Sequence, residues 1–449
     1  MPRTSTSPPQ LGRDFWLYRL GQLASVVGDS CNKLALAWWI LGETGSAATM
    51  ATIIAPVTFV QLLLIPLFGP IGDRFSRKHV ALISDAWRFG TALVLGLMAL
   101  RGYFNLPIIV AVALLHGVGS ALFMSVSQSI IPQLVRREHV ELAIQKDQAI
   151  TPVGTILGGV VGGVVVSWLG PAGALLIDAG TYFIATAATA SISAVTTAPS
   201  AESANGQMYT VRAWFNELKE GVRVVTSVPI ELGVAVLAGL LNLAIAPLDI
   251  SLAYFVKEAQ HQPAWLLGLL ETSMSIGAII GAMTLGSVQR WVRRSTIVFI
   301  GIAASGVAIM VLPWARGVLF PSTMLLLFGT AVIAANIPLK TQTTLAMPDA
   351  FRSRATSVRI FIGAIAAPAG IAVTGWLIST FGLETTLLVS GGSVLALSFA
   401  VFLIPNYRVF FDADADVTSR FYVEHYPEAF SRGGGEGPAQ IGKVLEVPE

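Results

Sequence analysis

Asp29 and Lys33 are two charged residues four positions apart inside a long apolar run. Residues four apart lie on one face of a helix, and an acid that precedes a base is the favourable order for an ion pair. A charged group in an apolar span costs about 2.5 kcal/mol or more, so such residues are functional candidates by default. Two roles are open for Asp29. It is either a carboxylate that binds a proton or a cation under the control of Lys33, or half of a permanent neutral pair that lets the run insert into lipid.

Polar residues also interrupt other apolar runs of the chain. His116 falls at a depth similar to that of Asp29, where a lone histidine is either a proton relay or a packing residue. Asp249 and Glu271 lie toward the outer third of their runs and are candidates for a second proton site. The residues that we expect to serve proton coupling or substrate contact are Asp29, Asn32, Lys33, His116, Asn242, Asp249 and Glu271.

Other charged residues in or near these runs suggest structural roles. Asp85 and Arg88 are about one turn apart, and we expect them to form a local ion pair. Lys340 and Arg359 stand near the inner ends of their runs, where long basic side chains extend their charges to the membrane interface.

The elements that hold these residues are predicted to be membrane helices. The chain has 449 residues, of which 54% are hydrophobic and 12% charged, with a mean hydropathy of +0.70. Soluble proteins carry about 25% charged residues, and a membrane-crossing helix needs about 20 apolar ones. Only helices or closed barrels satisfy the backbone in lipid, and the runs are too long for barrel strands. We therefore predict an all-α membrane protein with twelve spans, at about 15–42, 46–68, 79–101, 106–131, 147–168, 171–194, 229–257, 264–288, 295–315, 319–340, 354–380 and 384–405.

The basic residues between the runs predict the orientation. Loops on the cytoplasmic side of a membrane protein are enriched in Lys and Arg. The odd-numbered loops carry only Arg101, Lys257 and Arg316, whereas the even-numbered loops carry many more basic residues. Both termini are thus predicted to be cytoplasmic, in a multi-pass protein of the plasma (inner) membrane.

The spacing of prolines indicates two related halves. Pro132 and Pro152 are separated by the same interval as Pro348 and Pro368, and a polar linker divides the runs into two sets of six. Within the linker, the segment after residue 210 is predicted to be an amphipathic helix. The predicted organisation is an N-terminal segment (1–14), a six-helix bundle (15–194), the linker (195–228), a second six-helix bundle (229–405) and a partly disordered cytoplasmic tail (406–449).

Several kinds of site are not predicted. Cys31 is the single cysteine, which excludes an intramolecular disulfide and a cysteine-based metal site. The acidic tail segment 412–416 lacks the glycine and the glutamate of a calcium loop. No nucleophile–base set, phosphate loop or metal-spaced histidine cluster is recognisable. We expect no enzyme activity, no cofactor, no metal and no nucleic-acid partner; the expected partners are the bilayer and a small molecule, bound by a functional monomer.

The segment 69–78, GPIGDRFSRK, resembles the loop between spans two and three of the major facilitator superfamily. The matching residues are Gly69, Asp73, Arg74, Arg77 and Lys78, whereas Ser76 stands where the family has glycine. The resemblance implies two parallel six-helix halves, with span one beside a central cavity and span six at the periphery, where Asp178 would be structural. It also implies that the segment is a conformational latch, in which Asp73 contacts the start of span eleven.

Further segments are similar to the macrolide-efflux-type branch of drug:proton antiporters. They include VVGDSCNKLALAWWILGETGS, IIPQLVRREHVELA and LLIDAGTYF. A glycine motif in span five also resembles the antiporter pattern, with Thr155 in place of the usual proline; its glycines are Gly154, Gly158 and Gly159. These glycines permit close helix packing.

The resemblance implies a secondary transporter, and three hypotheses remain for its task. The first is proton-coupled efflux of amphipathic drugs or similar small molecules by alternating access, energised by the proton gradient. The second is a dedicated carrier of an endogenous molecule, such as a siderophore, secondary metabolite, lysolipid or metal ion. The third is a non-transporting membrane sensor.

Overall fold

The computed structural model describes residues 11–136, 139–193 and 211–430, and within these ranges the structure contains helices and no strand. Nothing is described for the side chains of residues 69–74, 128, 141, 149 and 211–218. The first half of the chain forms α1 (Arg13–Thr44), α2 (Ala47–Arg74), α3 (Arg77–Leu100), α4 (Leu106–Ile130) and α5 (Val140–Ala190). After the linker helix α6 (Val211–Ser227), the second half forms α7 (Pro229–Ile245), α8 (Pro247–Tyr254), α9 (Ala264–Val288), α10 (Arg294–Val311), α11 (Leu319–Ala346), α12 (Asp349–Ala364) and α13 (Ala367–Ala400).

Two of these helices each contain two membrane spans. α5 has 51 residues and α13 has 34, and each changes direction at one glycine with a left-handed backbone, Gly170 (φ 69°) and Gly382 (φ 81°). Glycine adopts positive φ at little cost, so it permits a sharp turn between two helices. The sequence places a boundary between spans within two residues of each glycine. The recurrence of the same device in both halves agrees with the predicted internal repeat.

The predicted all-α membrane fold is confirmed. Nine stretches of the described helices are long and apolar enough to cross a membrane. Two of them, 142–190 and 349–403, have 49 and 55 residues, about twice the length that one crossing requires. Counting each of these twice and adding the more highly charged α1 gives a number compatible with twelve spans.

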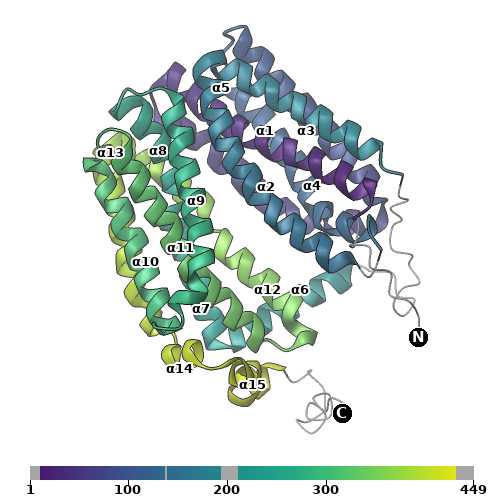
Figure 1. Cartoon of the computed structure of the whole chain (residues 1–449), viewed down its shortest axis with the longest axis vertical. Coiled ribbons are helices and arrows are strands. Elements are labelled where there is room, and N and C mark those ends of the chain that lie inside the picture. Colours follow the sequence, from purple (N-terminus) through teal and green to yellow (C-terminus); the bar gives the residue numbers. More distant parts are fainter. Residues whose placement is uncertain (1–10, 137–138, 194–210, 431–449) are drawn as a thin grey trace.

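The helices form two bundles that are inclined to each other, α1–α5 and α7–α13 (Figure 1). The face on which α1 begins and the C-terminal helices lie is called the terminal face below, and the other the opposite face. The bundles meet near the opposite face. There a Cβ on Gly268 of α9 would lie 2.2 Å from the Gly159 carbonyl oxygen of α5, and a Cβ on Gly375 of α13 would lie 2.5 Å from the Ala51 Cβ of α2. These glycines let the backbones approach closely and seal the opposite face.

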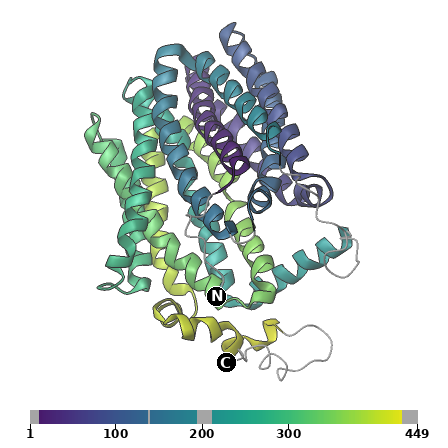
Figure 2. The same ribbon diagram turned by 45° about the vertical axis from the view of Figure 1, so that its right-hand side comes forward.

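The chain after residue 406 folds against the terminal face of the second bundle as α14 (Tyr407–Asp412), α15 (Ala415–His425) and α16 (Pro427–Phe430), shown in yellow in Figure 2. Asp412 accepts hydrogen bonds from the Ser295 amide (2.9 Å) and hydroxyl (2.7 Å) at the start of α10. The rings of Phe410 and Tyr422 stack with centroids 5.2 Å apart, and both are buried. The spacing of the aromatic residues in this segment does not show what they pack against.

Candidate functional site

A cavity of about 460 Å³ lies between the two bundles, and residues of both bundles line it. Lys33 of α1 reaches across this cavity to the second bundle. Its Nζ lies 3.1 Å from Asp249 Oδ1 of α8 and 3.4 Å from Glu271 Oε1 of α9. Two carboxylates thus share one ammonium group, and the triad carries one net negative charge when all three groups are ionised. The side chains of Lys33 and Asp249 are about half exposed, at 48% and 50%, whereas that of Glu271 is 16% exposed.

The predicted ion pair between Asp29 and Lys33 is wrong. Among the described side chains, Lys33 forms its ion pairs with the second bundle, and Asp29 instead accepts a hydrogen bond from the hydroxyl of Tyr182 in α5. The spacing of four residues places both groups on one side of α1 but does not fix which way a flexible lysine extends. Lys33 has two carboxylates within reach across the cavity, and these offer a stronger attraction than one acid on its own helix.

Asp29 belongs to a hydrogen-bonded chain inside the first bundle. Tyr182 Oη lies 3.3 Å from His116 Nε2, and His116 Nδ1 lies 2.9 Å from Thr91 Oγ1 of α3. His116 also lines the central cavity. The chain therefore connects the Asp29 carboxylate to the cavity through groups that donate and accept protons.

A second polar cluster lies beside this chain. The predicted Asp85–Arg88 ion pair is present, and both side chains are buried. The Arg88 guanidinium stacks on the ring of Phe123 at 4.2 Å and on that of Tyr182 at 4.5 Å. Asp85 therefore neutralises a cation that also supports the Tyr182 ring in its place next to Asp29.

Asp178 in the second limb of α5 is fully buried. Its Oδ2 accepts a hydrogen bond of 2.6 Å from Asn32 Nδ2, while its Oδ1 is buried without a hydrogen-bond partner in the described residues. Asn32 therefore ties α1 to α5 as well as lining the central cavity.

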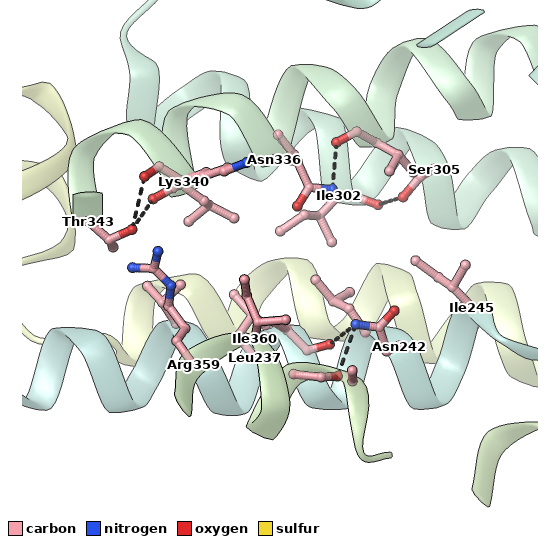
Figure 3. Close-up of a pocket in the computed structure, with 18 of the residues that line it drawn as sticks. Leu237, Asn242, Ile245, Ile302, Ser305, Asn336, Lys340, Thr343, Arg359 and Ile360 are labelled. Carbon is pink, nitrogen blue, oxygen red and sulfur yellow. Dashed lines mark hydrogen bonds between the residues drawn. The ribbon is translucent and has the colours of Figure 1, made fainter. Parts of the chain in front are cut away.

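Asn242 does not lie beside the Lys33–Asp249–Glu271 triad. It is placed in another cavity of about 430 Å³, which the second bundle alone encloses (Figure 3). Its Nδ2 donates to the carbonyl oxygens of Ala238 and Gly363, each at 3.0 Å. Gly363 lies just before the break between α12 and α13, so Asn242 connects span seven to span eleven where span eleven is interrupted.

Arg359 is buried, and its predicted extension to the membrane interface is wrong. Arg359 Nη1 lies 3.1 and 3.0 Å from the two carboxylate oxygens of Glu231 at the start of α7. Tyr422 of the tail donates a 3.1 Å hydrogen bond to the same carboxylate. Burial and the Glu231 carboxylate raise the pKa of the Tyr422 phenol well above its usual range. Because the carboxylate lies 128 residues away in sequence, the run around Arg359 alone gives no sign of it.

The predicted latch is only partly described. The side chains of Gly69, Asp73 and Arg74 lie outside the described residues, so the proposed role of Asp73 stays a prediction. Arg77 Nη1 donates to the Ser129 carbonyl oxygen at 2.9 Å, and Lys78 Nζ donates to the carbonyls of Ala190 (3.0 Å) and Ile192 (2.6 Å). Both cations thus bind carbonyls at the C-terminal ends of helices, where the helix dipole favours positive charge.

The span-five glycines pack against two different helices. A Cβ on Gly154 would lie 2.9 Å from Leu23 Cδ1, and one on Gly158 would lie 2.5 Å from Ser30 Cβ, both in α1. Gly159 faces α9 instead. The motif therefore holds α1 against α5 and also contributes to the seal between the bundles.

Three residues of these networks are not indicated by the sequence. Tyr182 and Tyr422 resemble ordinary aromatic residues of a span and a tail, and Glu231 resembles an acid at a helix start, where the dipole favours it. A phenol that bonds to a carboxylate from another part of the chain becomes recognisable only when distant segments are brought together. Among the described residues, no group of three His, Cys, Asp or Glu side chains could hold a metal ion.

Two inclined helical bundles around a shared cavity define a polytopic membrane transport protein. The sequence profile of the Major Facilitator Superfamily matches residues 20–371, and the chain belongs to this family. The predicted superfamily membership is therefore confirmed. The family and the fold are those of membrane transporters rather than of enzymes.

Curated relatives are distant but extend over most of the chain. The chain is 24% identical to the multidrug efflux pump Tap of Mycolicibacterium fortuitum, over 86% of this chain and 94% of the relative. It is 26% identical to the enterobactin exporter EntS of Citrobacter koseri, over 75% and 77% respectively. An uncharacterised transporter of this family from Bacillus subtilis, YvqJ, is 23% identical over 84% and 89%.

Solved structures share the fold at lower identity. The nucleoside transporter NupG superposes with a TM-score of 0.70 at 13% identity, over 88% of this chain and 99% of that one. A bacterial homologue of the iron transporter ferroportin, in its inward-facing state, gives a TM-score of 0.70 at 16% identity with the same coverage.

Proposed function

We propose that the protein is a proton-coupled secondary transporter that exports small amphipathic molecules from the cytoplasm by alternating access. The observation that carries this proposal is the ion triad, in which Lys33 of one bundle binds Asp249 and Glu271 of the other. An ion pair that crosses the bundle interface changes its geometry whenever the bundles rock. Its strength also depends on whether the two acids are protonated.

The structure corresponds to the inward-facing state under the orientation that the basic loops predict. The bundles touch near the opposite face through Gly159 with Gly268, and Lys257 Nζ donates to the Trp38 carbonyl oxygen at 2.6 Å across the same end. The terminal face would then be cytoplasmic, in the inner membrane. Protonation of Glu271 or Asp249 would leave Lys33 with a single charged partner. This loosening shifts the conformational equilibrium if the two states differ in proton affinity.

The direction of transport is argued from the relatives. Tap is named as an efflux pump and EntS as an exporter, so export is the direction that we propose for this chain. The similarity to EntS also favours a second candidate function, a dedicated exporter of one endogenous molecule. A single metabolite that accumulates in a deletion strain would select this second function over broad efflux.

Everted vesicles test the proposal. Respiration acidifies them, acridine orange reports the gradient, and an exported compound dissipates the gradient by exchange for protons. A panel of amphipathic cations, neutral compounds and anions should yield at least one compound that dissipates it with the wild type. Glu271→Gln should abolish this response, and Lys146→Gln, which removes an exposed charge on α5, should retain it. Transport by Glu271→Gln with an unchanged response to the gradient would refute proton coupling through the triad.

A further inference from the structure

The cavity inside the second bundle has cations at one end, and none of the described residues in its lining is acidic. Its volume of about 430 Å³ suits a small organic ligand. Among the described residues that line it, the ionisable ones are Lys340 and Arg359. Figure 3 shows them at the same end as Thr343, whereas Asn242, Ser305 and Ile245 lie toward the other end.

The charge at this end is only partly neutralised. Arg359 uses Nη1 for both of its bonds to Glu231, and its guanidinium points across the cavity toward Thr343 (Figure 3). The side chain of Lys340 is exposed and forms no ion pair or hydrogen bond with another described residue. Lys340, Arg359 and Glu231 together therefore leave one positive charge, which faces the cavity.

The rest of the lining is largely apolar. Between the two ends, Asn336 is a polar residue of the wall, and aliphatic side chains supply much of the rest: Leu237, Leu241, Ile302, Val332 and Ile360. Such a wall gains free energy by covering an apolar body, at roughly 25 cal/mol per Å² removed from water. The cavity thus offers a hydrophobic surface with a cation at one end, which complements an amphipathic anion.

We propose that this cavity binds amphipathic anions, with a carboxylate, phosphate or sulfate head at Lys340 and Arg359 and an apolar body along the aliphatic wall. Lysine supplies a mobile point charge, and the free edge of the guanidinium supplies directed donors. The proposal rests on the proposed transport function in one respect: it takes the bound anion to be a substrate that enters from the terminal face and is then transported. The binding itself does not require transport.

The cavity adjoins the central cavity at two helix breaks. Ile245 and Ala364 line the cavity of the second bundle, and Ala246 and Ala367, next to the same breaks, line the central one. Ala367 is eight positions after Arg359, across the break between α12 and α13, and eight residues of helix would span about 12 Å. The anionic head would therefore bind well away from the two carboxylates of the triad, which would repel it.

A matched set of fluorescent probes tests the proposal by equilibrium binding. Pyrenebutyrate, pyrenebutanol and pyrenebutylamine share one apolar body and differ in head charge. Fluorescence polarisation is measured on the purified full chain in phosphatidylcholine nanodiscs, with empty nanodiscs as the blank. A charge-assisted contact predicts that the wild type binds the carboxylate about tenfold more tightly than the alcohol, and the amine most weakly.

Two variants assign this preference to a residue. Lys340→Gln should reduce the preference for the carboxylate to less than about threefold while leaving alcohol binding unchanged. Lys146→Gln is the matched control, because it removes an exposed lysine of the first bundle that lines neither cavity. Equal binding of carboxylate and alcohol by the wild type would overturn the proposal. An unchanged preference in Lys340→Gln would overturn it as well.

A change of lipid in the nanodiscs shows whether the bound anion is a lipid head group or a soluble molecule. If phosphatidylglycerol in the nanodiscs competes with pyrenebutyrate, the cavity accepts anionic lipid heads; if it does not, the cavity selects soluble anions. Both outcomes support the binding of an amphipathic anion in this cavity. The binding assay needs no proton gradient, so its result is independent of transport. A wild type that prefers the carboxylate but shows no proton-driven transport would refute the proposed function alone. A wild type that transports but shows no preference for the carboxylate would refute this inference alone.

Discussion

Lys33 Nζ lies 3.1 Å from Asp249 Oδ1, and these two atoms belong to different bundles. The contact lies in the same inter-bundle cavity that Glu271 lines, one turn along α9 from Gly268 at the seal of the opposite face. A charged contact at this position responds to the relative tilt of the bundles. We therefore regard the triad as the place where protonation and conformation are linked.

Removal of the Lys33 charge should impair transport. Lys33→Met leaves two carboxylates facing each other in the cavity, which disfavours having both ionised. We expect transport to fall by at least about tenfold in the vesicle assay. Lys33→Arg, which keeps the charge and reaches both acids, should retain most of the activity. Equal loss in both variants would show that the shape of the side chain matters rather than its charge.

Asp29 should matter less than the triad. Asp29→Asn keeps an oxygen that accepts the hydrogen bond from Tyr182, so the variant should fold and transport with a reduction of a few fold. Tyr182→Phe removes the hydroxyl that joins Asp29 to His116 and should lower the free energy of unfolding by about 0.5–1.5 kcal/mol. Thermal unfolding of both purified variants and vesicle transport check these values. A complete loss of proton response in Asp29→Asn would instead make Asp29 the coupling residue.

The seal at the opposite face should be sensitive to one methyl group. In Gly268→Ala the new Cβ would lie 2.2 Å from the Gly159 carbonyl oxygen, so α5 and α9 must separate. We expect this variant to populate the inward-facing state less and to transport at least about fivefold more slowly. Gly286→Ala on the same helix meets nothing within 4 Å and serves as the control. Labelling of an engineered cysteine in the central cavity from each side of the membrane reports the shift.

The Glu231–Arg359–Tyr422 network should stabilise the attachment of the tail. Tyr422→Phe removes one hydrogen bond to a buried carboxylate and should cost about 1–3 kcal/mol of unfolding free energy. Tyr103→Phe, at a half-exposed tyrosine, should cost nothing measurable. Arg359→Met should cost more, about 3–5 kcal/mol, because Glu231 then keeps a buried charge without its cation. Chemical denaturation of the three variants in detergent measures the differences.

The same network predicts a dependence on alkaline pH. The pKa of Tyr422 is raised in the folded protein, so the folded state holds this proton more tightly than the unfolded one. The resulting stabilisation is fully present below the ordinary tyrosine pKa of about 10 and is lost as the pH rises above it. The stability of the wild type should therefore fall more steeply above pH 10 than that of Tyr422→Phe. Parallel curves would contradict the assigned shift.

The sequence predicts the helices far better than the contacts between them. Apolar length alone indicates the spans, and Gly170 and Gly382 lie at breaks that the sequence places within two residues. The polar residues of the triad are also recognisable, because charges in apolar runs are rare. The sequence does not indicate which of these residues pair. Lys33 has acids available on its own helix and on two others, and only the packing of the bundles decides among them.

The buried partners from distant segments are beyond the reach of sequence patterns. Glu231 and Arg359 are 128 residues apart, and neither carries a local sign of the other. Asp178 is predicted to be structural from the position of its span, and its contact with Asn32 then shows which helix it supports. The tail illustrates the same limit, because Phe410 and Tyr422 become a core only when α14 and α15 fold together.

The most direct test of the central claim needs no substrate. Spin labels at Lys146→Cys and Arg290→Cys, in a Cys31→Ser background, report the distance between the bundles at the terminal face by pulsed electron spectroscopy. We predict that the distance distribution of the wild-type triad shifts between two populations as the pH is lowered. The Asp249→Asn/Glu271→Gln variant should give one distribution at every pH. A pH-dependent shift of equal size in that variant would contradict the claim that the triad links protonation to conformation.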